Sequence, residues 1–318
     1  MAVAQPVRSR CRIGTRQSQL ARIQAEVLQD ALKRAHGDNA AIEIEAMRTS
    51  GDWRPEQGEI RLSEAAGGKG LFVREIERAL LAGEVDCGTH SLKDLPSDVP
   101  DGLEIAYMLP AGDPRDAFLS ARYDSIEQMP EGAIIGTSSL RRQSILLHRR
   151  PDLHVTTLRG NVNTRIEKMQ AGQVDAAILA YAGLERLGLG DQVTSVLDTD
   201  TLLPACGQGV ICVELRTGDR AMHDWLAPVH CYSTGLRCAA ERKALRVLGG
   251  TCHTPIGAHA ELGDNNRLRL RLSVAYADGR QRYDMDETAD VRDVEDAIAL
   301  GERTGRSMIE RMPADILT

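Results

Sequence analysis

The sequence contains no long hydrophobic run. No segment approaches the ~20 consecutive apolar residues that a membrane-spanning helix requires. The first fifteen residues, MAVAQPVRSRCRIGT, also have no apolar core of the length typical of a signal peptide. We therefore expect a cytoplasmic protein that does not associate with membranes.

Cysteines are few and scattered. There are seven in 318 residues, an odd number in a chain too large to depend on cross-links. This argues against a disulfide framework. Cys252 has His253 beside it, but no CxxC or HxxxH pair accompanies them, so we expect no metal site. Most of the cysteines are expected to be small buried side chains.

An excess of positive charge is also lacking. The formal net charge is −7, which gives no general attraction to nucleic acid. Arginines do concentrate locally, at Arg141, Arg142, Arg149, Arg150, Arg159 and Arg165. We expect Arg149 and Arg150 to lie on a solvated helix face, whereas the other four lie at predicted strand-to-helix junctions.

The chain is long enough for two or three domains, and its first part has an α/β pattern. Strands are predicted at 11–14 and 42–47, with a helix between them at 18–35. A second helix at 72–81 and a strand at 85–90 follow, and this strand leads into the loop SLKDLP. Loops after the strands of a parallel sheet are where α/β proteins hold ligands.

A second α/β block begins after the segment LPAGDP. It alternates predicted strands at 133–136, 155–158 and 176–179 with helices at 139–148 and 163–170. The segment LLPACGQGV then predicts a hinge, and the strand-like run after it is expected to return to the first block. From about residue 231 the pattern changes to helix 234–248, strands 256–262 and 268–276, and a last helix at 294–312.

These patterns predict an α/β fold of two lobes with a small α+β C-terminal domain. The predicted units are 1–109 with 210–228 as a discontinuous first lobe, 114–203 as the second lobe, and 231–318 as the third domain. Ile13-Gly14-Thr15 and Ile135-Gly136-Thr137 both end a strand and lead into a serine and a helix. This echo suggests similar lobes with ligand-facing helix N-termini.

The start of the second lobe's first helix combines two features of anion sites, backbone amides and arginines. It carries Thr137, Ser138, Ser139, Arg141 and Arg142. An ordinary N-cap followed by exposed arginines is the alternative. Similar groups at other junctions favour a ligand with several negative groups; these are Arg16 with Ser18, and Arg159 with Arg165.

Three further segments carry candidate groups. Lys69 lies in GGKGLF, which lacks the spacing of a nucleotide P-loop. Ser91, Lys93 and Asp94 follow a strand, where the acid and the lysine form either an acid/base site or an exposed ion pair. Cys252 lies in GGTCHTPIG, where it is either a buried spectator or a functional thiol.

In order along the chain, these motifs resemble those of the porphobilinogen deaminase (hydroxymethylbilane synthase) family. The segments are GTRQSQLA from Gly14, GGKGLFVREIE from Gly67, THSLKDLP from Thr89, DPRDAF from Asp113, GTSSLRRQ from Gly136, LRGNVNTRI from Leu158, LPACGQG from Leu203 and TCHTPIG from Thr251. The resemblance implies two lobes like type II periplasmic binding proteins. It also implies a transferase of haem (porphyrin) biosynthesis.

The resemblance implies a role for each candidate. Cys252 corresponds to the cysteine that carries a dipyrromethane cofactor through a thioether, and Asp94 to the catalytic carboxylate facing pyrrole nitrogens. Cofactor binding is implied for Lys93, Ser139, Arg141, Arg142, Thr137 and Ser91. Substrate binding is implied for Arg16, Ser18, Lys69, Arg159 and Arg165.

The reaction implied is the stepwise condensation of four porphobilinogen molecules, with loss of ammonia and final hydrolysis to 1-hydroxymethylbilane. We expect a monomer whose product passes to uroporphyrinogen III synthase. The alternative is a bilobal protein that binds a small oxyanion without catalysis, which would leave Cys252 and the third domain unexplained. Departures from the family pattern are Arg74, Gly88-Thr89, Thr251, the GQGVICVE segment and a long stretch at 52–66.

Overall fold

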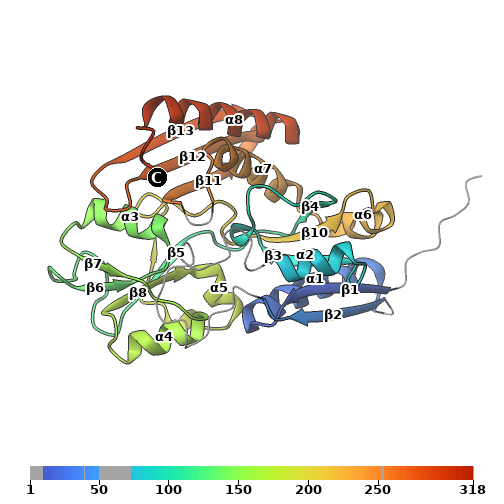
Figure 1. Ribbon diagram of the computed structural model, residues 1–318, viewed down its shortest axis with the longest axis horizontal. Helices are drawn as coiled ribbons and strands as arrows, with labels where there is room; N and C mark the ends of the chain where they lie inside the picture. Colours follow the sequence, from blue (N-terminus) through green and yellow to red (C-terminus); the bar gives the residue numbers. More distant parts are fainter. Residues whose placement is uncertain (1–9, 39, 50–72, 252–253, 318) are drawn as a thin grey trace, which may run out of the picture.

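The computed structural model describes residues 10–38, 40–49, 73–251 and 254–317. Three sheets with their helices form three units that meet at the centre of the molecule (Figure 1). The predicted fold class, two α/β lobes with a small α+β domain, is confirmed. Among the helices of the described ranges, none has the length and apolar character needed to cross a membrane.

The first lobe is built on a five-stranded sheet. Its strands, in spatial order, are β2 (Ala41–Met47), β1 (Arg10–Arg16), β3 (Cys87–Ser91), β10 (Ile211–Arg216) and β4 (Leu103–Met108). The packed helices are α1 (Gln19–His36), α2 (Arg74–Leu81) and α6 (Arg220–Leu226). Because β10 pairs antiparallel with β3 and β4, the chain returns to this lobe after leaving it, as the hinge pattern predicts.

The second lobe repeats this plan. Its sheet has the order β7 (His154–Thr156), β6 (Ile134–Gly136), β8 (Ala176–Ala180), β5 (Asp116–Leu119) and β9 (Ser195–Leu197). Its helices are α3 (Leu140–Arg149), α4 (Val162–Gln170) and α5 (Tyr181–Arg186). In both sheets the strand in fourth place is antiparallel to the strand in third place. The predicted echo between the lobes is therefore present in the sheets themselves.

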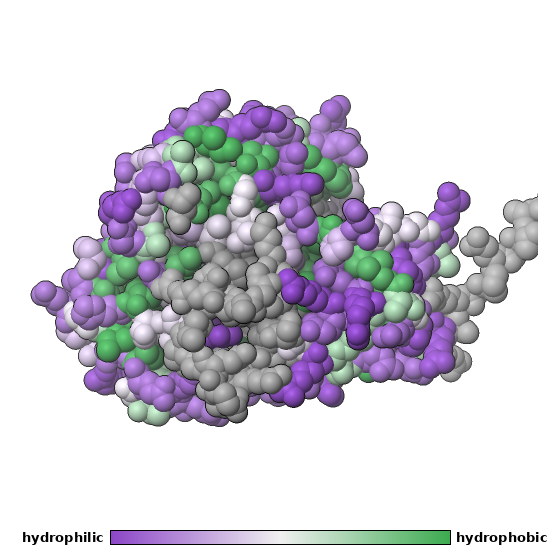
Figure 2. All heavy atoms as spheres, viewed as in Figure 1, coloured by the Kyte–Doolittle hydropathy of each residue, from purple (hydrophilic) through white to green (hydrophobic). Residues whose placement is uncertain are grey.

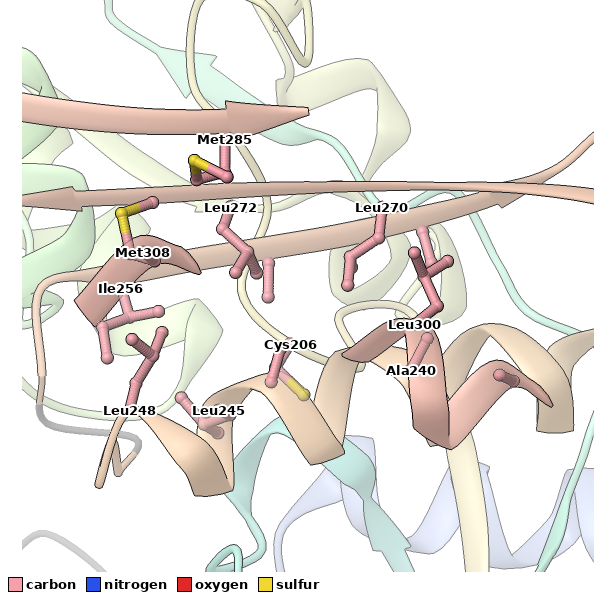
Figure 3. Close-up of a cluster of buried hydrophobic side chains, with 14 of the residues drawn as sticks. Cys206, Ala240, Leu245, Leu248, Ile256, Leu270, Leu272, Met285, Leu300 and Met308 are labelled. Atoms are coloured by element: carbon pink, nitrogen blue, oxygen red, sulfur yellow. The ribbon is translucent and has the colours of Figure 1, made fainter. Parts of the chain in front are cut away.

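The third domain packs two long helices on one face of an antiparallel sheet. The strands are β11 (Ile256–Leu262), β12 (Arg267–Ala275) and β13 (Arg282–Asp290), and the helices are α7 (Tyr232–Val247) and α8 (Val294–Arg311). Leu270 and Leu272 of β12 face Leu245 of α7 and Leu300 of α8 in a continuous apolar core (Figure 3). Hydrophilic side chains predominate along the upper edge of the molecule, over α8 (Figure 2).

This domain touches both lobes. The turn between β12 and β13 contains Gly279, which has a φ of 75°, and a methyl group there would overlap the backbone of Leu147 and His148 in α3. The carbonyl oxygen of Gly279 lies 2.9 Å from His148 Nδ1. On the other side, Arg242 of α7 donates a hydrogen bond to the Pro96 carbonyl oxygen of the first lobe. The third domain therefore braces the two lobes against each other.

Candidate active site

Loops from all three units surround one cavity of about 160 Å³. The first lobe contributes the short 3-10 turn η2 (Leu92–Asp94), and the second lobe contributes the start of α3 and Arg165 of α4. The hinge contributes Gln208, and the third domain contributes Thr251 and Thr254. Ligand sites commonly form where such loops meet.

Six of the residues predicted from the sequence line this cavity: Asp94, Lys93, Ser139, Arg141, Arg142 and Arg165. Among the described residues, five others lie outside the lining: Arg16, Ser18, Ser91, Thr137 and Arg159. Ser91 and Thr137 each directly precede a lining residue. Cys252 and Lys69 lie outside the described residues, but Thr251 and Thr254, on either side of residues 252–253, both line the cavity.

The start of α3 is fixed by local hydrogen bonds. Ser139 is the N-cap, and its Oγ accepts from the Arg142 backbone N–H, which satisfies one of the free amides of the first turn. The Thr137 Oγ1 accepts from the Ser139 backbone N–H, and the Ser138 Oγ donates to the Leu158 carbonyl oxygen. These bonds place Arg141 and Arg142 on the inner side of the helix.

Arg141 and Arg142 are not exposed arginines. They are 3% and 5% exposed, and both pair with Asp116 at the start of β5, at 2.7 Å each. Burial alone would raise the pKa of Asp116, but the two guanidinium groups outweigh it and lower the pKa to about 2. The alternative of a cap with solvated arginines is therefore wrong.

Each guanidinium also holds a backbone carbonyl. Arg141 Nη1 donates to the Leu203 carbonyl oxygen, and Arg142 Nη1 donates to that of Ile178. The buried Arg141 Nε has no hydrogen-bond partner among the described residues. Buried donors without a partner are rare in proteins, and this one belongs to a side chain that lines the cavity.

A chain of polar contacts continues from Asp116 to the first lobe. Gln208 Nε2 donates to Asp116 Oδ1 at 2.9 Å, and Lys93 Nζ donates to Gln208 Oε1 at 3.5 Å. Burial, together with the charge of Arg142, lowers the pKa of Lys93 to about 8. An anion bound beside the ammonium group would raise this pKa again and favour the charged form.

Asp116 and Gln208 were not among the site residues predicted from the sequence, although the structure connects both to the arginines of α3. Asp116 lies in the DPRDAF segment, where only its membership of the motif signals a role.

The expectation that Arg150 lies on a solvated helix face is also wrong. Its guanidinium pairs with Asp152 and donates to the Ile126 and Met129 carbonyl oxygens, so it braces a turn.

The cavity differs from a metal centre. In the described part of the chain, no group of three or more His, Cys, Asp or Glu side chains is arranged to hold a metal ion. The charged side chains of its described lining are four arginines, Lys93 and one acid, Asp94. Such a lining suits a ligand that carries several carboxylates and a positively charged reacting centre.

Comparison with known proteins agrees with this chemistry. Residues 11–224 match the family model for "Porphobilinogen deaminase, dipyromethane cofactor binding domain", and residues 235–310 match that for "Porphobilinogen deaminase, C-terminal domain". Porphobilinogen deaminase of Nitrobacter hamburgensis is 45% identical over 94% of this chain and 92% of its own length. That of Phenylobacterium zucineum is 44% identical over 95% of each.

Solved structures show a weaker similarity. A nutrient-binding protein from Burkholderia cenocepacia bound to methionine covers 69% of this chain and 89% of its own, with a TM-score of 0.42 and 13% identity.

Proposed function

The chain belongs to the porphobilinogen deaminase family, and from that premise we propose how its residues share the work of the reaction. The enzyme is a transferase that condenses four porphobilinogen molecules head to tail, with release of ammonia, and yields 1-hydroxymethylbilane after hydrolysis. One observation carries the proposal. The Asp94 turn, the arginines of α3 and both residues flanking positions 252–253 line a single cavity.

We assign catalysis to Asp94. Ammonia leaves porphobilinogen with help from the pyrrole nitrogen, so positive charge develops on that nitrogen. An ionised carboxylate at hydrogen-bond distance stabilises this charge and can accept or return a proton. Asp94 ends the η2 turn, so its position is set by the backbone of that turn.

The basic residues bind carboxylates. Each porphobilinogen unit carries an acetate and a propionate, so a growing chain adds two negative charges per ring. Arg141, Arg142 and Lys93 are proposed to hold the cofactor with the help of Ser139, Thr137 and Ser91. Substrate binding is proposed for Arg16, Ser18, Lys69, Arg159 and Arg165.

The cavity fits the dipyrromethane that the family model specifies. The basic side chains of the described lining outnumber its one carboxylate, Asp94, so the lining has positive charge to offer the carboxylates of a ligand. When bound, the dipyrromethane provides the terminal pyrrole on which the chain grows. We propose Cys252 as its point of attachment, because the residues on either side of positions 252–253 line the cavity.

Cys206, the cysteine that lines the cavity among the described residues, is a poor nucleophile. Cys206 lines the cavity but is only 8% exposed, and burial raises the pKa of its thiol. Cys238 is almost fully buried, and burial likewise raises the pKa of its thiol. The thiolate is the reactive form, so both are unsuited to attachment.

Intact mass and peptide mapping test the proposal. The purified protein should exceed its sequence mass by two porphobilinogen units less two ammonias. Cys252→Ala should fold and lack both the added mass and all activity, while Cys206→Ala keeps both. Mapping that finds the adduct on Cys206 or Cys238 would refute the assignment.

The remaining expectations are proposals of the same kind. The domains are proposed as 1–109 with 210–228, 114–203 and 231–318. We propose a cytoplasmic monomer that hands its product to uroporphyrinogen III synthase. Sedimentation at increasing protein concentration tests the monomer. Faster conversion of the released bilane when the synthase is present during turnover, rather than added afterwards, tests the transfer.

A further inference from the structure

Helix α7 contacts the segment that carries Asp94. Arg242 Nη2 donates hydrogen bonds to the carbonyl oxygens of Pro96 at 2.9 Å and Ser97 at 3.2 Å. These two residues follow Asp94 closely in the same loop. A guanidinium group that bridges two consecutive carbonyls restrains the path of the backbone between them.

Glu241, the preceding residue of α7, binds the hinge segment that packs against the start of the same turn. Buried Glu241 accepts hydrogen bonds from the backbone N–H groups of Gly207 and Ala260, both at 2.7 Å. Gly207 has a φ of 67°, and a methyl group there would lie 2.7 Å from the Leu92 side chain. The hinge glycine thus packs directly on the first residue of η2.

We infer that Glu241 and Arg242 are positioning residues, which hold the Asp94 turn in register with the third domain. The inference rests on the proposed roles of Asp94 and Cys252. Helix α7 ends at Val247, five residues before Cys252, so the helix that contacts the Asp94 turn also leads to the proposed point of attachment. The growing chain is thereby anchored to the same body that sets the position of the carboxylate.

The contacts give the inference its physical basis. Hydrogen-bond catalysis by Asp94 requires its carboxylate to lie within a few tenths of an ångström of the correct place. An error of ~1 Å costs up to about 10²-fold in rate. Arg242 also lines the cavity, so the competing interpretation is that its guanidinium binds a substrate carboxylate. Positioning affects kcat, whereas simple substrate binding affects KM.

Arg242→Ala in the cofactor-loaded full chain separates the two. We expect kcat to fall about 10- to 100-fold, with KM within about twofold of the parent and full cofactor occupancy by intact mass. Guanidinium ion at millimolar concentration should restore part of kcat, because Arg242 is accessible from the cavity. Arg242→Lys, which keeps the charge but supplies a single point donor, should lose less.

Arg246→Ala is the matched control. Arg246 lies one turn further along α7 and pairs with Asp98 of the same loop, but both side chains are about two-thirds exposed. An exposed ion pair contributes little, so this variant should keep the parent kcat. Glu241→Gln replaces one of the two accepting oxygens with an NH₂ donor, which then faces a backbone N–H donor. We therefore expect this variant to lower kcat, as Arg242→Ala does.

A double variant separates failure of this inference from failure of the proposed function. If Asp94→Asn remains fully active, the role of Asp94 is wrong and the inference falls with it. If Asp94→Asn is impaired and Arg242→Ala is not, only the inference is overturned. When both hold, adding Arg242→Ala to Asp94→Asn should lower kcat little further. Raised KM at unchanged kcat, or loss of cofactor from Arg242→Ala, would also overturn the inference.

Discussion

The two lobes have the same strand order, but they bury different kinds of side chain at equivalent positions in the sheet. Ile211 opens β10 opposite Ser91, the last residue of β3. Asp116 opens β5 opposite Ala180, the last residue of β8. Ile211 and Asp116 therefore hold equivalent positions, and both are almost fully buried.

The facing helices differ in the same way. After the capping Ser18, the second and third residues of α1 are Leu20 and Ala21, whereas the same positions after Ser139 are Arg141 and Arg142. The positions that form a buried ionic cluster in the second lobe are thus occupied by apolar residues in the first. Buried ion pairs seldom stabilise a fold more than apolar residues of similar size. We interpret the cluster in the second lobe as serving its ligand.

Copying the first lobe into the second gives the sharpest test of this comparison. Asp116→Ile, Arg141→Leu and Arg142→Ala together should leave a folded protein, because no charge is left unpaired. The ~1–4 kcal/mol that such replacements can gain is offset by the Leu203 and Ile178 carbonyl oxygens, which lose their donors at ~1–3 kcal/mol each, so the free energy of unfolding should lie close to the parent's. Intact mass should show complete loss of the cofactor, and activity should vanish. A variant that retained the cofactor would assign the cluster a purely structural role.

Removing only the acid should have the opposite effect on stability. Asp116→Ala leaves two buried guanidinium groups without their counter-ion, which should lower the free energy of unfolding by ~3–5 kcal/mol. Urea denaturation followed by circular dichroism measures this change. The Ile211→Ala variant, at the matching place in the first lobe, is the control and should lose only a cavity term of ~2–5 kcal/mol without loss of cofactor.

Asp94→Asn tests the one carboxylate in the described lining of the cavity, which the first lobe supplies. The amide is nearly isosteric, so the fold and cofactor attachment should persist. Loss of the charge opposite a pyrrole cation should lower kcat by ~10²–10³-fold, more than it changes KM. Single-turnover measurements that follow each pyrrole addition by mass check this. Elongation at the parent rate would show that Asp94 is a structural ion-pair partner.

The smallest effect concerns the pH response of Lys93. Its pKa is lowered to about 8, so the folded protein loses this positive charge above that pH while the unfolded chain keeps it. Stability should therefore rise with pH from about 8 towards the ordinary lysine pKa. Cofactor assembly by cofactor-free protein should slow about tenfold per pH unit over the same range. Lys93→Arg should move this decline to higher pH, and a flat profile in the parent would refute it.

Much of the fold follows from local patterns. Apolar residues at helical and strand spacing located β1, α1 and β2, and the Pro- and Gly-bearing segments located both crossings between the lobes. Strand β13 was not predicted, because only Met285 of its nine residues is buried and its composition is that of a loop. Strand β5 was missed because it is short and begins with a charged residue.

The site was predictable in its members but not in its pairing. Motif resemblance assigned Asp94, Arg141 and Arg142 to the site, and all three line the cavity. Spacing could not show that both arginines meet Asp116, which lies 25 residues before Arg141 and on a different element. Long-range ion pairs depend on how strands are ordered in the sheet. Sequence periodicity does not contain that information.

The turn at Gly279 bears on how the molecule can move. Two lobes that are joined only by a hinge can open and close about that hinge. Here the third domain contacts α3 through this turn and the Pro96 loop through α7. The two lobes are therefore connected through the third domain as well as through the hinge. Opening of the lobes would disrupt one of these two contacts. We therefore expect these contacts to restrain opening of the lobes, and a lengthening product to be accommodated mainly by local displacements around the cavity.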